Sequence, residues 1–325
     1  MAKSDRAPAN EFVRIARRVY DPLGFSKGCN FILWFIFTGT LMGFILAKFS
    51  YLGYSRFLCS EKGTAPGECY NYRKYPHEKA GIILHLAGIL PGGFLACFQF
   101  VPVLRHKAIL FHRINGYIVV LLSMIATVGA LLVARHAFGG GVETQTVVGF
   151  LAIMFLGAMT MAYIKIKRLQ IEQHRAWMLR AWFYASAVIT LRIIEIISTT
   201  IISTMSGYYS ARPCAQIFDT LEGNQTTTLQ HYPECAAFFS GADPDRHAAV
   251  KAQLGGDGGS AIGAAAALGM TFGASAWLAM ALHAIGVEIY LRLTPAEHER
   301  LRNVSYQRRL EAGMENPGQA GLTVD

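Results

Sequence analysis

Long apolar stretches alternate with shorter polar segments along most of the chain. A bilayer core about 30 Å thick requires about 20 apolar residues in a helix that rises about 1.5 Å per residue. Six stretches are of that kind: residues 31–50, 81–102, 114–135, 146–164, 178–204 and 263–291. A soluble fold does not need so many long uncharged runs. The pattern therefore predicts an all-α fold, a polytopic integral membrane bundle of six transmembrane helices.

The residues before the first predicted span form a basic, partly amphipathic segment. Phe12, Ile15, Ala16 and Val19 recur at helical spacing among arginines. This is typical of a helix lying in the inner headgroup layer, although a solvated helix would give the same pattern. The 31–50 stretch begins too late and is too long for the apolar core of a cleaved signal peptide. We therefore expect it to remain as the first span.

Basic residues are concentrated on one side of this topology. The chain has 30 Lys and Arg residues; nineteen lie in the N-terminal segment, the second connection, the fourth connection taken with Arg180, and the C-terminal tail, whereas nine lie in the other three connections. An excess of Lys and Arg marks cytosolic loops, so both termini are expected in the cytosol. The net charge of +9 is then a topology signal, and nucleic acid is not expected as a partner.

These assignments divide the chain into three parts. Residues 1–30 are expected to form a basic cytosolic segment. Residues 31–291 would form the transmembrane bundle, with two long outer loops at 51–80 and 205–262. Residues 292–325 would form a cytosolic tail that is partly disordered. The sequence shows no internal repeat and no second soluble domain.

Four of the six cysteines lie in the two long outer loops: Cys59, Cys69, Cys214 and Cys235. Disulfides form in oxidising compartments, which is where the charge distribution places these loops, but the sequence does not choose among the three possible pairings. The sequon at Asn224 also lies outside and is expected to carry a glycan, whereas that at Asn303 lies inside and is not. A eukaryotic secretory-pathway membrane, such as that of the endoplasmic reticulum, fits these features.

Ionisable side chains inside the predicted spans are the main candidates for chemistry, because each costs about 2.5–3.5 kcal/mol to place at the bilayer centre. Arg192 and Glu195 lie three residues apart on one helix face. His85 enters the second span from the same, outer side, and His136 and Glu143 at the outer rim would close the same cavity. Glu195 is thus a candidate general acid or base, with Arg192 and His85 as partners. A buried ion pair that only locks two helices is the alternative.

A second group of polar residues is expected near the inner face: His112, Arg113, His174, Arg180 and His283. Such residues can bind a polar or anionic substrate head, or simply anchor the helices among the headgroups. Because three of them are histidines, the group would also permit a b-type haem with two histidine ligands. The sequence does not require this cofactor, since no span carries one histidine toward each membrane face. Neither a cofactor nor a metal ion is therefore expected.

Five blocks of residues, in their order along the chain, resemble the sequence pattern of a known family. They are His85, Gln99-Phe100, Leu110–Tyr117, Gln173–Arg180 and Leu191-Arg192. The family is the multi-pass membrane family called domain of unknown function 2306, and the likeness covers roughly residues 80–200. Its fungal members resemble membrane-bound terpene cyclases of the ascofuranone, or meroterpenoid, type. The resemblance implies proton-initiated cyclisation of an epoxidised prenyl chain, and it carries over no established catalytic residue.

We therefore predict a membrane enzyme that acts on a lipophilic prenylated substrate. The reaction would be that of a terpene cyclase, an isomerase of secondary metabolism, which opens an epoxide by acid catalysis and closes a ring. Glu195 would donate the proton, His85 would accept or relay one, and Arg192 would orient the acid. The alternative is a haem b transmembrane oxidoreductase linked to a quinone. A transporter or scaffold is a further alternative, although no inverted repeat is present.

Overall fold

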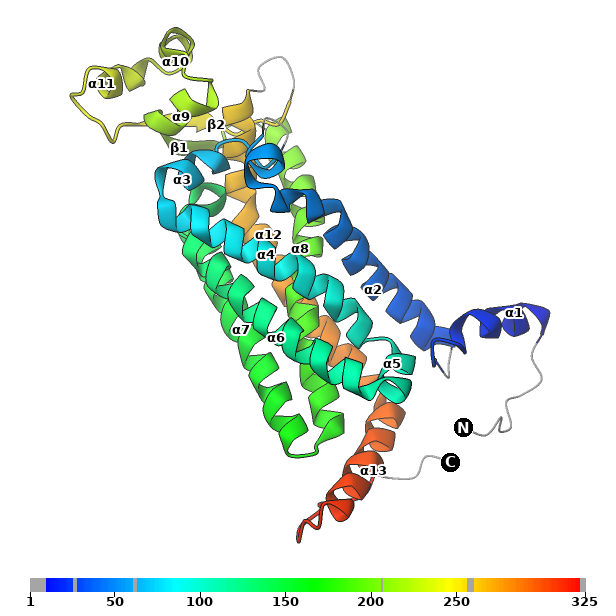
Figure 1. Ribbon diagram of the computed structural model, residues 1–325. Coiled ribbons are helices and arrows are strands. Elements are labelled where there is room, and N and C mark those ends of the chain that lie inside the picture. The colour runs from blue at the N-terminus through cyan, green and yellow to red at the C-terminus, as the bar shows by residue number, and fades with distance from the viewer. Residues whose placement is uncertain (1–9, 26–27, 61–62, 206, 256–259, 322–325) are drawn as a thin grey trace. The chain divides into compact units, whose positions relative to one another are not determined.

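The structure is a computed structural model that describes residues 10–25, 28–60, 63–205, 207–255 and 260–321 (Figure 1). Six of the helical segments in these residues are long and apolar enough to cross a membrane, as predicted: Gly28–Leu52, Pro76–Gln99, Ile109–Val133, Val142–Lys167, Ile171–Thr204 and Ala261–Arg292. Most extend several residues beyond the apolar stretch at one end, because helical hydrogen bonding continues into the polar flank. The chain divides into two compact units, residues 1–58 with 83–128 and residues 59–82 with 129–325.

The first unit is helical. Its elements are α1 (Glu11–Tyr20), α2 (Gly28–Lys48), the short helices η1 (Phe49–Leu52) and η2 (Tyr54–Leu58), most of α4 (Pro76–Gln99), α5 (Pro102–Lys107) and most of α6 (Ile109–Val133). The predicted amphipathic segment forms α1, whose first turn is capped by Asn10 accepting a 2.9 Å hydrogen bond from Val13 N. Ile15 and Val19 are exposed on α1, as expected for a helix that lies on a membrane.

Within this unit, α4 and α6 approach each other closely at Gly88. A Cβ there would lie 2.6 Å from the carbonyl oxygen of Leu122, so a larger residue does not fit. Asn115, which is buried, donates a 3.0 Å hydrogen bond from Nδ2 to the carbonyl oxygen of Leu95. Small residues and side-chain amides are common where membrane helices pack.

The second unit holds the remaining elements. They are α3 (Glu68–Lys74), η3 (Ala137–Gly139), α7 (Val142–Lys167), α8 (Ile171–Thr204), β1 (Tyr209–Pro213), α9 (Cys214–Thr220), α10 (Gln225–His231), η4 (Pro233–Cys235), α11 (Ala236–Phe239), β2 (His247–Lys251), α12 (Ala261–Arg292) and α13 (Pro295–Glu311). The long helices α7, α8 and α12 pack side by side. The buried hydroxyls of Thr199 on α8 and Thr271 on α12 share a 2.8 Å hydrogen bond.

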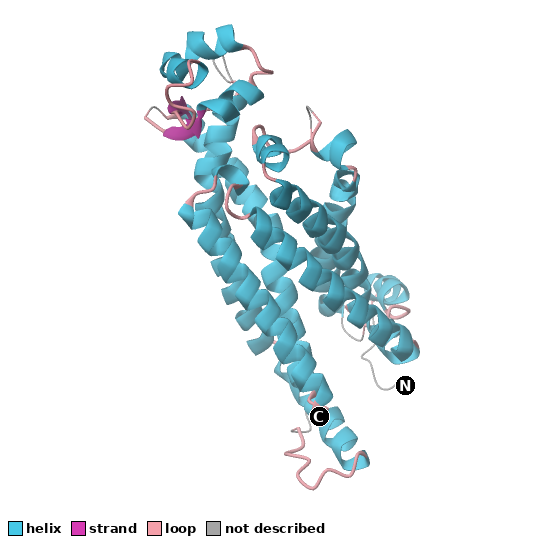
Figure 2. Cartoon of the chain, turned by 60° about the vertical axis from the view of Figure 1, so that its left-hand side comes forward, coloured by secondary structure: helices cyan, strands magenta, loops and turns pink. Residues whose placement is uncertain are grey.

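The segment between α8 and α12 forms a small lobe, called the outer lobe, that consists of β1, β2, η4 and α9 to α11 (Figure 2). Its two strands are antiparallel, with Ala211 opposite Ala249. A disulfide joins Cys214 to Cys235, both fully buried beside Ile217 and Val250 in an apolar core. A second disulfide joins Cys59 to Cys69. These are the pairings that the sequence left open.

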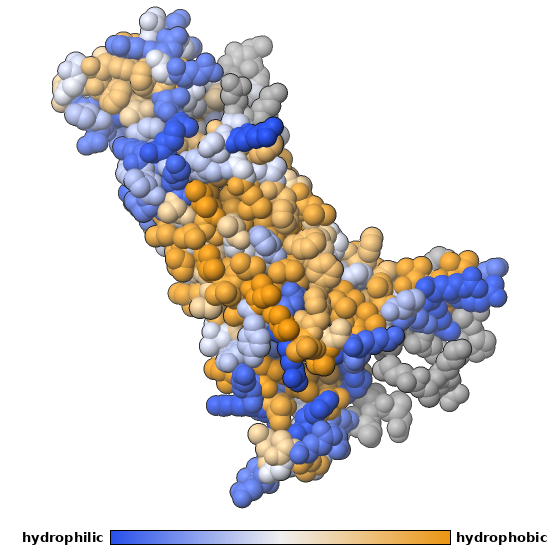
Figure 3. All heavy atoms as spheres, viewed as in Figure 1, coloured by the Kyte–Doolittle hydropathy of each residue, from blue (hydrophilic) through white to orange (hydrophobic). Residues whose placement is uncertain are grey.

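The three connections predicted to lie outside the membrane meet in this unit. Asn71 on α3 donates a hydrogen bond of 3.5 Å to the carbonyl oxygen of His136. Gln216 of the outer lobe donates one of 3.0 Å to the carbonyl oxygen of Gly67. The contacts agree with the predicted grouping of loops. Figure 3 shows mainly hydrophobic side chains over the membrane-spanning helices, whereas the outer lobe carries hydrophobic and hydrophilic side chains together.

The predicted cytosolic tail is largely helical among its described residues, because α13 accounts for Pro295–Glu311. It packs against the first turn of α8, where the buried Ser305 accepts a 2.8 Å hydrogen bond from Ile171 N. The same hydroxyl donates to Oε2 of the buried Glu172. The tail thus meets the loop between α7 and α8, which the charge pattern places on the same side. The last predicted tail residues, 322–325, lie outside the described part of the chain.

Candidate functional site

Arg192 and Glu195 face the same side of α8, as their spacing predicts. Nη1 of Arg192 donates a 2.7 Å hydrogen bond to Oε2 of Glu195. The side chain of Glu195 is 2% exposed and that of Arg192 37% exposed. Oε1 of Glu195 is buried and has no hydrogen-bond partner among the described residues. One carboxylate oxygen is therefore paired with a cation while the other remains available.

Two aromatic rings hold the guanidinium group of Arg192 in place. Its central carbon lies 4.7 Å from the ring centre of Phe138 and 5.4 Å from that of Phe272. The two rings are stacked, with centres 4.0 Å apart. Cation–π contacts of this kind hold a guanidinium group without consuming its hydrogen-bond donors. Phe138 belongs to the η3 loop and has φ 50°, a left-handed conformation uncommon for residues other than glycine.

The η3 loop also binds a buried carboxyl group from α3. The backbone N–H of Phe138 donates a 3.0 Å hydrogen bond to Oε1 of Glu68, which is 4% exposed. Burial raises the pKa of Glu68 from 4.5 to about 7, against the opposing effects of the Phe138 N–H and of the charges of Arg212 and Arg192. Arg212 at the start of the outer lobe is 3% exposed, and burial lowers its pKa while the Glu68 charge raises it.

A second acid lies next to this arrangement. Glu78 at the start of α4 is completely buried and pairs through Oε1 with Nδ1 of His136. The ring of Tyr75 stacks on His136 at a centre-to-centre distance of 4.6 Å. Glu78 acts electrostatically on Glu68. The sequence had grouped His136 with Glu143 at the outer rim; the structure instead pairs His136 with Glu78 and places Glu143 against Gly273.

These residues form one group, called here the buried carboxylate cluster: Glu68, Glu78, Glu195, Arg192, Arg212 and His136. Each of the three glutamates has one buried oxygen without a partner in the described part of the chain: Oε2 of Glu68, Oε2 of Glu78 and Oε1 of Glu195. Because an unpaired buried carboxylate oxygen is costly, such groups either hold a proton or face a proton-bearing partner that is not part of the chain. The cluster is thus suited to proton transfer.

Sequence reasoning singled out Arg192 and Glu195 as candidates, but not Glu68, Glu78 or Arg212. These three lie at the ends of spans or in outer loops, where charged residues are ordinary. For Glu68 and Arg212 the available signal was their position, since Glu68 precedes Cys69 directly and Arg212 lies two residues before Cys214. Disulfides fix the neighbouring backbone, so a charge beside one can be held in a buried place.

His85, the third predicted catalytic residue, lies in the first unit. Its Nδ1 is 2.9 Å from the carbonyl oxygen of Ala126 on α6. A carbonyl only accepts, so Nδ1 carries the proton, and in the neutral ring the lone pair is on Nε2. His85 therefore has one nitrogen used for helix packing and one with the chemistry of a proton acceptor.

The predicted inner group is divided between the two units. His112 and the exposed Arg113 belong to the first, and His174, Arg180 and His283 to the second. Nε and Nη2 of Arg180 bind the two carboxylate oxygens of Glu288 on α12 at 2.6 and 2.9 Å. This two-point pairing gives Arg180 a structural partner on the last membrane-spanning helix.

The histidines of the inner group are engaged by the surrounding helices. Nδ1 of His174 is 2.9 Å from the carbonyl oxygen of Ala162. Nδ1 of His283 is 2.7 Å from the carbonyl oxygen of Phe183, and its Nε2 is 2.8 Å from the hydroxyl of Thr190. A haem iron could bind His283 only if one of these hydrogen bonds were given up. Among the described residues, no three His, Cys, Asp or Glu side chains are placed to hold a metal ion.

Comparison with known proteins adds two findings. Residues 80–213 match the family described as "Predicted membrane protein (DUF2306)", which confirms the expected resemblance for this part of the chain. Over 334 residues, the chain is 25% identical to "Ava biosynthesis cluster protein G" of Aspergillus versicolor, and the match covers 87% of this chain and 94% of that protein. No solved structure matches. The protein is an integral multi-pass membrane protein that is similar to a protein of a biosynthesis cluster.

Proposed function

We propose that the protein is an integral membrane enzyme of a biosynthetic pathway, which closes a ring in a lipophilic prenylated substrate by acid-catalysed opening of an epoxide. The observation that carries this proposal is the environment of Glu195. The residue is 1% exposed, one oxygen is bound to Arg192, and the other has no partner in the described chain. The similarity to a protein of a biosynthesis cluster supports a role in making a small molecule.

In the proposed reaction, Oε1 of Glu195 carries the proton that is transferred, while Oε2 stays bound to Arg192. Protonated Oε1 donates its proton to the epoxide oxygen while the weaker C–O bond breaks and its electron pair goes to that oxygen. The carbon left electron-deficient is attacked by a hydroxyl oxygen of the same substrate, which forms the ring and releases a proton. The net change is an isomerisation, without oxidation or reduction.

Arg192 and His85 complete the proposed chemistry. When Glu195 has lost its proton, its negative charge is stabilised by the hydrogen bond of 2.7 Å from Arg192, whose guanidinium group is held by Phe138. The proton that the attacking hydroxyl releases goes to a general base, the role that the sequence analysis assigns to His85, whose Nε2 carries the lone pair. The two paired disulfides and the sequon at Asn224 support a secretory-pathway membrane, such as the endoplasmic reticulum, as its place of action.

The test is turnover of epoxidised prenyl-phenols by membranes that contain the protein, followed by mass spectrometry. Glu195→Gln removes the acid but keeps the shape, so it should lower turnover by about 10²–10⁴-fold. Glu288→Gln also removes a carboxylate that is paired with an arginine, at the other end of the bundle, and should keep most of the activity. If Glu195→Gln turns over at the rate of the unmodified protein, Glu195 is not the acid.

A further inference from the structure

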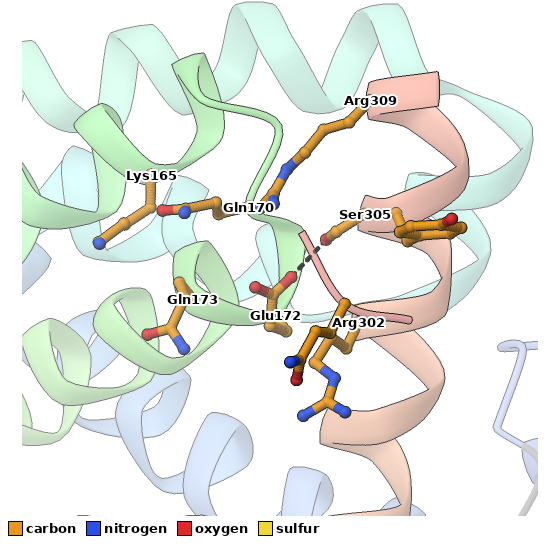
Figure 4. A pocket seen from close by; sticks show the side chains of 9 residues that line it. Lys165, Gln170, Glu172, Gln173, Arg302, Ser305 and Arg309 are labelled. Carbon is orange, nitrogen blue, oxygen red and sulfur yellow. Dashed lines mark hydrogen bonds between the residues drawn. The ribbon is translucent and has the colours of Figure 1, made fainter. Parts of the chain in front are cut away.

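A polar cleft lies at the opposite end of α8 from the buried carboxylate cluster. It has a volume of about 450 Å³ and is bordered by the last turn of α7, the first turn of α8 and one side of α13 (Figure 4). Glu172 and Glu195 are 23 positions apart on one helix, which corresponds to about 35 Å. The cleft is therefore a separate site, and nothing in the proposed cyclisation uses it.

Three cationic side chains from two different elements line this cleft. Lys165 comes from α7, and Arg302 and Arg309 come from α13. The ammonium group of Lys165 has no hydrogen-bond or ion-pair partner within the described residues. The carboxyl group on the lining, Glu172, is occupied by the Ser305 hydroxyl. Arg302 also forms an ion pair with Glu299 at 3.3 Å, whereas neither Lys165 nor Arg309 has one within the described residues. The lining thus carries three positive charges against the single negative charge of Glu172.

Several polar atoms at the cleft are buried without a partner in the described part of the chain. They are Nε of Arg302, Nε of Arg309 and Oε1 of Gln170. A guanidinium group with a free Nε can present two parallel N–H donors, the arrangement that fits a phosphate group. Gln173 and Gln319 on the same walls carry amide donors that suit the remaining phosphate oxygens.

The arginines are held in position by the chain that follows α13. Nη2 of Arg302 donates a 2.9 Å hydrogen bond to the carbonyl oxygen of Ala320. Nη1 of Arg309 donates one of 2.9 Å to that of Pro317. Each guanidinium group is thus fixed through one nitrogen, and α13 itself is attached to α8 through Ser305. Ordering the side chains in advance reduces the entropy lost when an anion binds.

We propose that this cleft binds a phosphate monoester or diphosphate group, with Lys165, Arg302 and Arg309 as its cationic ligands. The level of the site favours such a group, because Lys165 lies in the last turn of a membrane-spanning helix, where lipid headgroups and soluble phosphates both have access. The phosphate group is common to both sources. Binding there attaches α13 to the end of the bundle and requires no chemistry at the buried carboxylate cluster.

The experiment measures binding to the purified full-length protein in a non-ionic detergent by isothermal titration. The probes are inorganic pyrophosphate, dioctanoyl phosphatidic acid and, as a zwitterionic reference, dioctanoyl phosphatidylcholine. We expect saturable binding of at least one of the first two, and affinity that falls with added salt. Arg309→Gln and Lys165→Gln should each weaken it about tenfold or more, since each removes a charged hydrogen-bond donor.

Arg308→Gln is the matched control, because it removes the same charge from the neighbouring residue, which does not line the cleft and is exposed. The affinity of the Arg308→Gln variant for the phosphate probe should stay within about twofold of that of the unmodified protein. Binding of phosphatidic acid alone identifies a lipid headgroup, binding of pyrophosphate alone a soluble ligand, and binding of both the phosphate group itself. The proposal is wrong if neither probe saturates, or if Arg308→Gln weakens binding as much as Arg309→Gln. Lys165→Gln, on a different helix, provides the answer should Arg309→Gln fail to fold.

Discussion

The guanidinium group of Arg212 lies directly over Gly269 of α12. Its Nη2 donates a 2.7 Å hydrogen bond to the carbonyl oxygen of Ala265, one turn earlier on the same helix. A buried arginine can approach a helix backbone this closely only where no side chain intervenes. The small residues at the start of the last span thus make room for a charge.

Gly269→Ala should destabilise the protein by about 1–3 kcal/mol, because the added Cβ would overlap Nη2 of Arg212 and lie 2.8 Å from the carbonyl oxygen of Phe138. Gly286→Ala on the same helix is the control, since nothing lies within 4 Å of its Cβ and alanine favours the helix. Thermal unfolding in detergent gives the comparison. Equal melting temperatures for the two variants would mean that Arg212 is not held in this position.

The stability of the protein should depend on pH through Glu68. Its pKa in the folded protein is raised by burial to about 7, above the 4.5 of an ordinary glutamate. Between these values the folded protein keeps a proton that the unfolded chain releases, so the free energy of unfolding falls as the pH rises, by up to about 3 kcal/mol. Glu68→Gln should remove this part of the dependence in melting curves recorded from pH 4.5 to 7.5. Glu222→Gln, at an exposed position of the outer lobe, should leave it unchanged.

The outer lobe should depend on the bond between Cys214 and Cys235, which are 21 positions apart. Opening a loop of this length costs about 3 kcal/mol in the chain-entropy account. The Cys214→Ala/Cys235→Ala double variant should therefore unfold at a lower temperature, with earlier protease cleavage inside 207–255. Cys29→Ala, which removes an exposed free thiol, should change neither quantity. A double variant as stable as the unmodified protein would show that the lobe does not need the bond.

Glycosylation provides a test of the predicted sidedness. Asn224 is exposed and caps α10 by accepting a 3.0 Å hydrogen bond from Thr227 N. In a eukaryotic host, enzymatic removal of N-glycans should reduce the mass of the protein, and Asn224→Gln should abolish that shift. Asn303→Gln should leave the shift intact, because Asn303 is on the side predicted to be cytosolic. Detection of a glycan on Asn303 would show that the topology is the reverse of the predicted one.

The transmembrane helices and the Arg192–Glu195 pair could be predicted because both depend on residues close in sequence. The length of an apolar run determines whether a helix spans the bilayer, and a spacing of three places two side chains on one helix face. Neither inference requires knowledge of where the chain goes next. The amphipathic first helix around Ile15 was predictable for the same reason.

The remainder of the site depends on contacts between distant segments. His136 pairs with Glu78, which lies 58 positions earlier in the sequence. Arg180 pairs with Glu288, which lies 108 positions later. Each of these charges could equally well be solvated or anchored at the membrane surface when considered alone. Which charges pair depends on how the outer loops and helices contact one another. The alternation of apolar and polar runs along the sequence does not contain that information.

The position of the two disulfides has a consequence for how the protein matures. Cys69 directly follows Glu68, and Cys214 lies two residues after Arg212, so the bonds immobilise the backbone that carries both buried charges. Insertion into the membrane depends on the apolar runs, which contain none of these four cysteines. Oxidation of the outer loops is therefore expected to be a separate step of maturation, the one that fixes the backbone beside Glu68 and Arg212.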